Sequence, residues 1–212
     1  MRWLPIGSWE PHASHLPYDT DTLIARHLAA ECAMDTDTVL PTVPYSCSFE
    51  HRDTGRPVSF RVTTLVAVVT DIARSSAEPL VIINGHGGNQ VLDTLAQELN
   101  ATGSSVLLLP TRAHWDAAYA ATGWPFRGHD DMHAGAMERS LLLIWEPEHV
   151  HATLPDDTAA PDRPLFSAYG MRPYTATGGI GFPSQASVAA GHAAIQALVH
   201  QMKATVKDWI HG

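Results

Sequence analysis

The run Asn84-Gly85-His86-Gly87-Gly88-Asn89 constrains the fold of this chain more than any other feature. It follows the apolar residues 80–83 and precedes an amphipathic stretch from 90 to 99, so the sequence predicts a buried strand, a glycine-rich turn and a helix. Units of this kind build parallel sheets, and the ligands of such sheets bind at the carboxyl ends of the strands. Glycine also lets the backbone approach a ligand closely. We therefore expect His86 to lie at a functional site.

The rest of the chain alternates predicted strands with predicted helices. Short apolar runs predict strands at 4–7, 39–43, 79–84 and 105–109. Apolar residues at helical spacing predict helices at 22–33, 63–73, 90–100, 134–144 and 184–209. The stretches 45–57, 113–129 and 146–176 are predicted to be loops. The alternation favours an α/β fold with three layers, in which helices flank both faces of a mostly parallel sheet. We expect one domain over residues 1–212, because no repeat or linker interrupts the pattern.

Composition narrows the possible partners. The 212 residues include 22 acidic and 13 basic side chains and carry a formal net charge of -9. This charge argues against nucleic acid or an anionic membrane as the main partner. No stretch reaches the roughly 18 apolar residues of a membrane span. Two cysteines, Cys32 and Cys47, are too few for a disulfide framework and indicate a reducing cytoplasm.

Four residues have the side chains that bind a divalent metal through nitrogen and oxygen: Glu10, His12, Asp21 and His86. Glu10 and His12 are two positions apart, so both can point to one side of an extended segment. Asp21 lies at the predicted start of a helix, where a carboxylate is electrostatically favoured and can bridge two ions. We expect a metal site formed by these residues.

A further polar cluster occupies residues 129–138. His133 and Glu138 lie on either side of the predicted start of the helix at 134–144. Each can serve as an acid or base in catalysis, or as a further metal ligand. We count both as catalytic candidates, and Glu138 also as a candidate ligand.

Taken together, the motifs resemble those of the creatininase family of metal-dependent amidohydrolases. That family carries Gly-Ser-x-Glu-Gln-His-Gly-x-His-Leu-Pro-x-x-Thr-Asp, and residues 7–21 read Gly-Ser-Trp-Glu-Pro-His-Ala-Ser-His-Leu-Pro-Tyr-Asp-Thr-Asp. The family's Asn-Gly-His-Gly-Gly-Asn recurs at 84–89, and its Asp-x-His-Ala-Gly-x-x-Glu-Thr-Ser is similar to Asp-Met-His-Ala-Gly-Ala-Met-Glu-Arg-Ser at 131–140. Residues 179–183 resemble its Gly-Val-x-Gly-x-Pro. The four motifs occur in order along nearly the whole chain.

The resemblance implies a creatininase-like fold with two divalent ions per chain, drawn from Zn, Mn and Fe. It places Glu10 and His86 on one ion and His12 on the other, with Asp21 bridging the two. It also implies a homo-oligomer, a hexamer in many members of the family.

The chain departs from the family at positions that bear on the substrate. Creatininase has a glutamate two residues after the equivalent of His86, where this chain has Gly88. We hypothesise that Glu138 replaces that carboxylate on the second ion. The loop at 46–57 keeps Glu50 and His51 but loses the last four residues of the family pattern. We expect Glu50, His51 and Gly87 to contact the substrate.

These observations predict a hydrolase that cleaves the C–N bond of a small amide with metal-activated water. Within the family, Gly88 argues against creatinine. A formamide substrate is favoured, as in the deformylation of a formylamino-pyrimidine ribotide. The alternatives are a peptidase that acts on a short precursor peptide in mycofactocin-type cofactor maturation, and hydrolysis of a creatinine-type cyclic amide. An alternative of another class is a metal-binding homologue that has lost catalysis.

Overall fold

The computed structural model describes residues 1–212, and its centre is a sheet of four parallel strands in the order β2-β1-β3-β4. The strands are β1 (Arg2–Ile6), β2 (Thr38–Val39), β3 (Leu80–Asn84) and β4 (Val106–Leu109). The main helices are α1 (Thr20–Cys32), α2 (Val62–Arg74), α3 (Val91–Ala101), α4 (Arg112–Thr122), α5 (Ala136–Trp145) and α7 (Val188–His211). The short α6 (Phe166–Tyr169) lies in the predicted loop at 146–176. The predicted α/β fold is therefore confirmed, and every strand pair is parallel.

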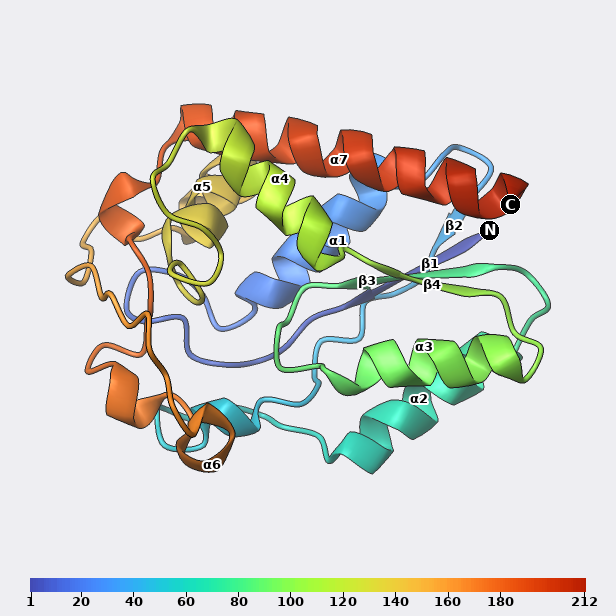
Figure 1. Cartoon of the computed structure of the whole chain (residues 1–212), viewed down its shortest axis with the longest axis horizontal. Coiled ribbons are helices and arrows are strands. Elements are labelled where there is room, and N and C mark those ends of the chain that lie inside the picture. The colour runs from blue at the N-terminus through green and yellow to red at the C-terminus, as the bar shows by residue number, and fades with distance from the viewer.

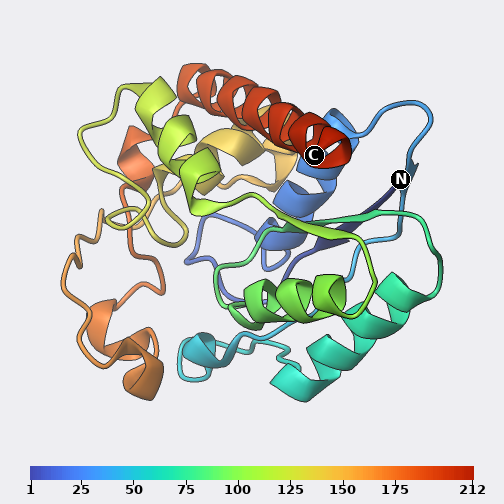
Figure 2. The ribbon, with the colours of Figure 1, turned by 45° about the vertical axis from the view of Figure 1, so that its right-hand side comes forward.

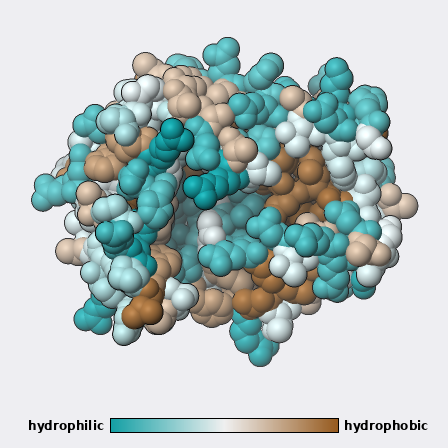
Figure 3. Space-filling view, viewed as in Figure 1, coloured by the Kyte–Doolittle hydropathy of each residue, from teal (hydrophilic) through white to brown (hydrophobic).

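Two layers of helices cover the sheet (Figure 1). Successive side chains of a strand point to opposite faces, so Trp3 packs with α1, α4, α5 and α7, whereas Leu4 packs with α2 and α3. Since both faces are covered, the central part of the sheet is apolar on both sides, as residues 80–83 of β3 show. The three predicted layers are present, and the edge strand β4 lies between α7 and α3, where Figure 3 shows hydrophobic surface.

The prediction of a loop over 113–129 is wrong, because residues 112–122 form α4. The backbone N–H of Thr111 donates to the side chain of His114 at the start of the helix, and Gly123 ends it with a positive φ of 75°. The buried side of α4 consists of His114, Ala118 and Tyr119. A polar, a small and an aromatic residue do not form the apolar stripe by which the other helices were predicted.

The remaining boundaries differ from the predictions by a few residues. Helix α5 begins at Ala136, two residues later than predicted, and α7 begins at Val188, with the side chain of Ser187 capping it. No helix of the structure has both the length and the apolar character needed to cross a membrane.

Candidate metal centre

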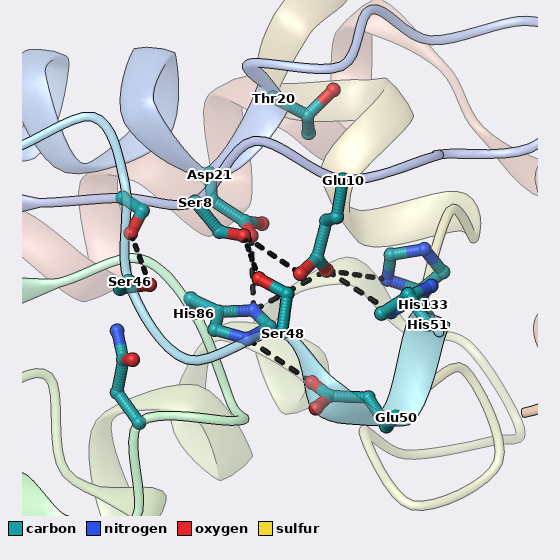
Figure 4. A network of polar contacts seen from close by, with 12 residues as sticks. Ser8, Glu10, Thr20, Asp21, Ser46, Ser48, Glu50, His51, His86 and His133 are labelled. Atoms are coloured by element: carbon teal, nitrogen blue, oxygen red, sulfur yellow. Dashed lines mark hydrogen bonds and ion pairs between the residues drawn. The ribbon is translucent and has the colours of Figure 1, made fainter. Parts of the chain in front are cut away.

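The predicted ligands converge at the carboxyl end of the sheet, although they come from distant parts of the sequence. Figure 4 shows Glu10, Asp21 and His86 of this group. Glu10 and His12 follow β1, Asp21 lies in the first turn of α1, and His86 follows β3. All four are at most 5% exposed. A Cβ at Gly85 would lie 2.2 Å from the carbonyl oxygen of Asp21. Glycine at this position therefore lets the turn after β3 pack directly against α1.

Asp21 lies between two histidines and presents one oxygen to each. Its Oδ1 is 3.1 Å from His12 Nε2, and its Oδ2 is 3.0 Å from His86 Nδ1. Glu10 Oε1 lies 3.3 Å from the same His86 nitrogen. A carboxylate that offers its two oxygens in two directions has the arrangement expected of a ligand that bridges two ions.

Backbone carbonyls fix which nitrogen of each histidine faces the centre. His86 Nε2 donates to the carbonyl of Cys47 (2.8 Å), His12 Nδ1 to that of Glu10 (3.1 Å) and His133 Nε2 to that of Pro11 (2.7 Å). In the neutral rings, these hydrogen bonds leave the opposite nitrogens as lone pairs that point at the carboxylates. Histidines that bind metals are oriented by hydrogen bonds of this kind.

Two buried carboxylate oxygens in the cluster have no hydrogen-bond donor, Glu10 Oε1 and Asp21 Oδ2. Imidazole nitrogens surround Glu10 Oε1, with His51 Nε2 at 3.2 Å and His133 Nδ1 at 3.7 Å, but none is aligned to donate. Lone pairs that face one another in a buried site are costly unless a cation lies between them. Imidazole nitrogen and carboxylate oxygen suit Zn, Mn and Fe. The residues therefore fit divalent metal ions.

Charges in the cluster shift the pKa values of the histidines in opposite directions. Burial disfavours the charged form of His12, but the Asp21 carboxylate outweighs this effect and raises the pKa of His12 to about 9. Burial, and then the positive charges of His12 and His51, lower the pKa of His133 well below its usual range. His133 is thus neutral at pH 7, with an acceptor nitrogen toward the centre.

Glu138 reaches the centre from the first turn of α5. Its Oε2 accepts a hydrogen bond from the backbone N–H of Ala134 (2.6 Å) and lies 3.9 Å from His12 Nε2. Burial raises the pKa of Glu138 to about 7. His12, His133 and Glu138 offer ligand atoms that lie within 4.8 Å of one another. This geometry supports the hypothesis that Glu138 serves the ion on the side of His12.

Two serines that the sequence analysis did not single out support Glu10. Ser8 Oγ donates to Glu10 Oε2 (2.7 Å) and also lies 2.6 Å from Ser48 Oγ, and both serines are completely buried. Figure 4 shows this chain of contacts from the loop at 46–51 to the carboxylate. Because Oε2 is held by Ser8, Oε1 is the oxygen left facing the histidines. The signal available in the sequence was the Gly-Ser pair two residues before Glu10.

The predicted substrate residues are distributed around the centre. His51 is buried against Glu10, and Glu50 Oε1 lies 3.1 Å from His86 Nε2. A Cβ at Gly88 would lie 2.3 Å from both of these atoms of Glu50 and His86. Gly87 instead lines a separate cavity of about 290 Å³ beside β4 and the start of α4.

The sequence model described as Creatininase: Creatinine amidohydrolase matches residues 2–206. The chain belongs to the creatininase family. Members of this family hydrolyse C–N bonds, so the protein is an amidohydrolase. The family predicted from the four motifs is confirmed.

Three curated relatives show how the creatininase family divides by substrate. The mycofactocin precursor peptide peptidase of Mycobacterium ulcerans (strain Agy99) is 30% identical over 227 residues, which cover 99% of this chain and 85% of the relative. The creatinine amidohydrolase of Pseudomonas putida is 28% identical over 69% of this chain and 65% of its own length. The 2-amino-5-formylamino-6-ribosylaminopyrimidin-4(3H)-one 5'-monophosphate deformylase of Methanocaldococcus infernus (strain DSM 11812 / JCM 15783 / ME) is 31% identical over 102 residues, which cover 45% of each chain.

Solved structures of creatininases share the fold. One described as creatininase Mn superposes with a TM-score of 0.81 at 23% identity, over 98% of this chain and 90% of the other. A mutant creatininase described as Zn-Zn type gives a TM-score of 0.79 at 23% identity, with the same coverage. Manganese and zinc are the metals named for these two creatininases.

Proposed function

We propose that this creatininase-family amidohydrolase uses two divalent ions to hydrolyse an amide bond of a short peptide. The observation that carries the proposal is Asp21, which presents one oxygen to each of two histidines whose outer nitrogens are held by backbone carbonyls. Glu10 and His86 would hold one ion, and His12 and Glu138 the other, with Asp21 shared. Ions bound there supply Lewis acidity, which lowers the pKa of water and polarises a carbonyl.

Proton transfer during hydrolysis would be carried out by a side chain of the protein. His133 is neutral and turns Nδ1 toward the centre, so it can accept a proton from the attacking water and deliver it to the leaving nitrogen. Its Nε2–H stays on the carbonyl of Pro11, which holds the ring in place. The buried walls exclude bulk water, so the charges of the centre act at close range.

Similarity over the full length favours a peptide over the formamide that the sequence motifs favoured. The peptidase resembles 99% of this chain, whereas the deformylase resembles 45% of it. A formamide remains the second candidate, because the deformylase is also a relative. Glu50 and the ring of His86 fill the space beside Gly88, which disfavours a creatinine-type site with a glutamate there.

We also propose that the chain forms a homo-oligomer. Light scattering in solution would measure the molar mass of the assembly.

The first experiment is to measure metal per chain in protein purified without added metal, with His86→Ala as the control. We expect about two ions per chain in the wild type and a loss of bound metal in the variant. The loaded protein is then assayed on short peptides, formamides and creatinine. Metal without turnover on any of these amides would instead favour a binding protein that has lost catalysis.

Glu138→Gln separates the two roles of Glu138. Loss of one ion together with activity is expected if Glu138 is a ligand, because the amide is a poor replacement for the carboxylate. Full metal content with lost activity would assign Glu138 as the acid or base instead. If metal content and activity both stay unchanged, Glu138 has neither role.

A further inference from the structure

A polar cavity of about 390 Å³ lies beside the metal centre and is not explained by it. The cavity is lined by Asp53, Thr54, Arg172, Thr175, Ala176, Thr177 and Gly178. Its volume is within the range of small-molecule sites. Two segments form it, the loop that follows His51 and the stretch after α6, and Figures 1 and 2 show these segments side by side. The N–H of Met171 donates to the carbonyl of Glu50 and joins them.

The cavity adjoins the centre through two of its walls. Thr54 Oγ1 lies 3.3 Å from Nδ1 of His51, the ring whose other nitrogen faces Glu10. On the opposite wall, Gly178 packs against Ala13, the residue after His12. A substrate whose scissile bond lies at the metal centre would therefore extend into this cavity.

Arg172 lines the cavity with an exposed side chain whose positive charge is not paired within the chain. Its guanidinium makes no ion pair and no hydrogen bond with any other residue. The neighbouring carboxylate of Asp53 is engaged by Arg52 at 3.5 Å. Thr175 Oγ1 accepts hydrogen bonds from the N–H groups of Thr177 and Gly178, which fixes this hydroxyl at the cavity wall.

We infer that this cavity is a subsite for an anionic group of the substrate, bound by Arg172 with the hydroxyl of Thr175. A guanidinium offers paired donors that match the oxygens of a carboxylate or a phosphate. In a chain with a net charge of -9, a free arginine in a cavity is also a local attraction for an anion. The inference rests on the proposed function and defines its substrate as an amide that carries a carboxylate or a phosphate.

Matched substrates test the subsite. The metal-loaded enzyme is assayed on a short peptide with a free carboxylate and on the same peptide with an amidated end. It is also assayed on a formylated aminopyrimidine riboside with and without its phosphate. Wild type is expected to show a lower KM for the charged member of one pair than for its neutral counterpart. The pair that shows this difference identifies the bound anion as a carboxylate or a phosphate. Arg172→Ala should reduce that preference about 10- to 100-fold, because an ionic hydrogen bond is lost, and Arg172→Lys should restore part of it. Arg74→Ala, which removes an exposed arginine at the end of α2, is the control for net charge.

Equal activity on charged and neutral substrates, or equal losses on both in Arg172→Ala, would overturn the inference. If no amide is hydrolysed, the proposed function fails, and the subsite is tested by binding alone. The loaded wild type and Arg172→Ala are then titrated with inorganic phosphate and with acetate. Phosphate or acetate that binds directly to the metal ions does so equally in both proteins, so it does not affect the difference between them. Weaker binding by the variant supports the subsite, and identical binding overturns it.

Discussion

Two polar clusters lie near opposite ends of β1, and they differ in how their charges are satisfied. At the amino end, the guanidinium of Arg2 donates five hydrogen bonds, to the carbonyls of Ile72, Ala73, Ser76 and Glu78 and to the hydroxyl of Ser75. Only its Nε has no hydrogen-bond partner, and this atom lies 4.0 Å from the carboxylate of Glu78. Nearby, Asp37 accepts from the indole of Trp3 and from the N–H of Met34. At the carboxyl end, Glu10 and Asp21 each keep a buried oxygen without a donor.

The difference teaches how to separate structural from functional polar groups. A buried charge that the chain itself satisfies stabilises the fold, because leaving it unpaired would cost free energy. A buried carboxylate oxygen that has no donor within the chain, and that lies among histidines oriented by carbonyls, indicates a binding site for a cation. The predictions below test whether the two clusters behave in these different ways.

Asp21→Asn should have the largest effect. We expect the variant to lose most of its bound metal and more than about 100-fold in kcat/KM, since even partners of ligands are worth about 10- to 100-fold. Metal analysis and steady-state kinetics measure this. Full metal content in the variant would contradict the bridging role.

Metal affinity should fall as the pH falls. The raised pKa of His12, about 9, means that the metal-free protein holds a proton on this ring below that pH, and an ion must displace it. The proton of His12 alone gives about a tenfold gain in affinity per pH unit below 9, or roughly 100-fold between pH 6 and 8. Burial disfavours the charged form of His86 too, but the carboxylates of Glu10 and Asp21 outweigh it and raise the pKa of His86 as well, so its proton steepens the dependence. Calorimetry in buffers of different ionisation enthalpy counts the protons. An affinity that does not change with pH would show that His12 is not displaced.

Ser8→Ala should weaken metal binding about 10- to 100-fold without unfolding the protein. The reason is that Glu10 Oε2 loses its donor, so the carboxylate is free to turn Oε1 away from the centre. Metal titration of the variant is the measurement. Ser75→Ala, at the amino-end cluster, is the matched control and should keep the wild-type affinity.

Asp37→Ala should affect stability and leave the metal centre intact. Loss of hydrogen bonds to a charged group should cost about 1.5–3 kcal/mol in the free energy of unfolding near pH 7. Burial raises the pKa of Asp37, but the N–H of Met34 and the indole of Trp3 outweigh this and lower it. The stabilisation is thus present above the unfolded pKa of about 3.9 and lost as the pH falls through the folded pKa.

Denaturation of wild type and Asp37→Ala at neutral and acid pH measures this difference. The gap between them should narrow in acid. A loss of bound metal in Asp37→Ala would show that the two ends of the strand are not independent.

Local patterns in the sequence were sufficient to predict the sheet and to select residues that the structure brings together at the candidate centre. Apolar runs predicted β3 and α3, the spacing of Glu10 and His12 marked these two as candidate ligands, and the glycine-rich turn after a strand marked His86. Each of these signals spans only a few residues, and metal chemistry requires particular residue types there. Helix α4 was missed because its buried side is His114, Ala118 and Tyr119, which carries no apolar period.

The finer geometry could not be predicted, because it depends on contacts between distant segments. The carbonyls of Cys47 and Pro11 orient His86 and His133, yet a carbonyl is present at every position and gives no signal. Arg172 lies near the loop after His51 because hydrogen bonds join the two segments, such as that from the N–H of Met171 to the carbonyl of Glu50. The role of Asp131, which accepts from the N–H groups of Ala136, Met137 and Phe182, likewise becomes visible only when the chain is folded.

Gly88 also bears on how such an enzyme can change in evolution or by engineering. Any side chain at position 88 would collide with the carboxylate of Glu50 and the ring of His86. Shortening Glu50 would relieve only one of these contacts, because a Cβ at 88 would still lie 2.3 Å from His86 Nε2 and 2.7 Å from the carbonyl oxygen of Cys47. A library that varies position 88, alone or together with position 50, should therefore return mostly inactive clones, because a side chain at 88 displaces the ring of His86.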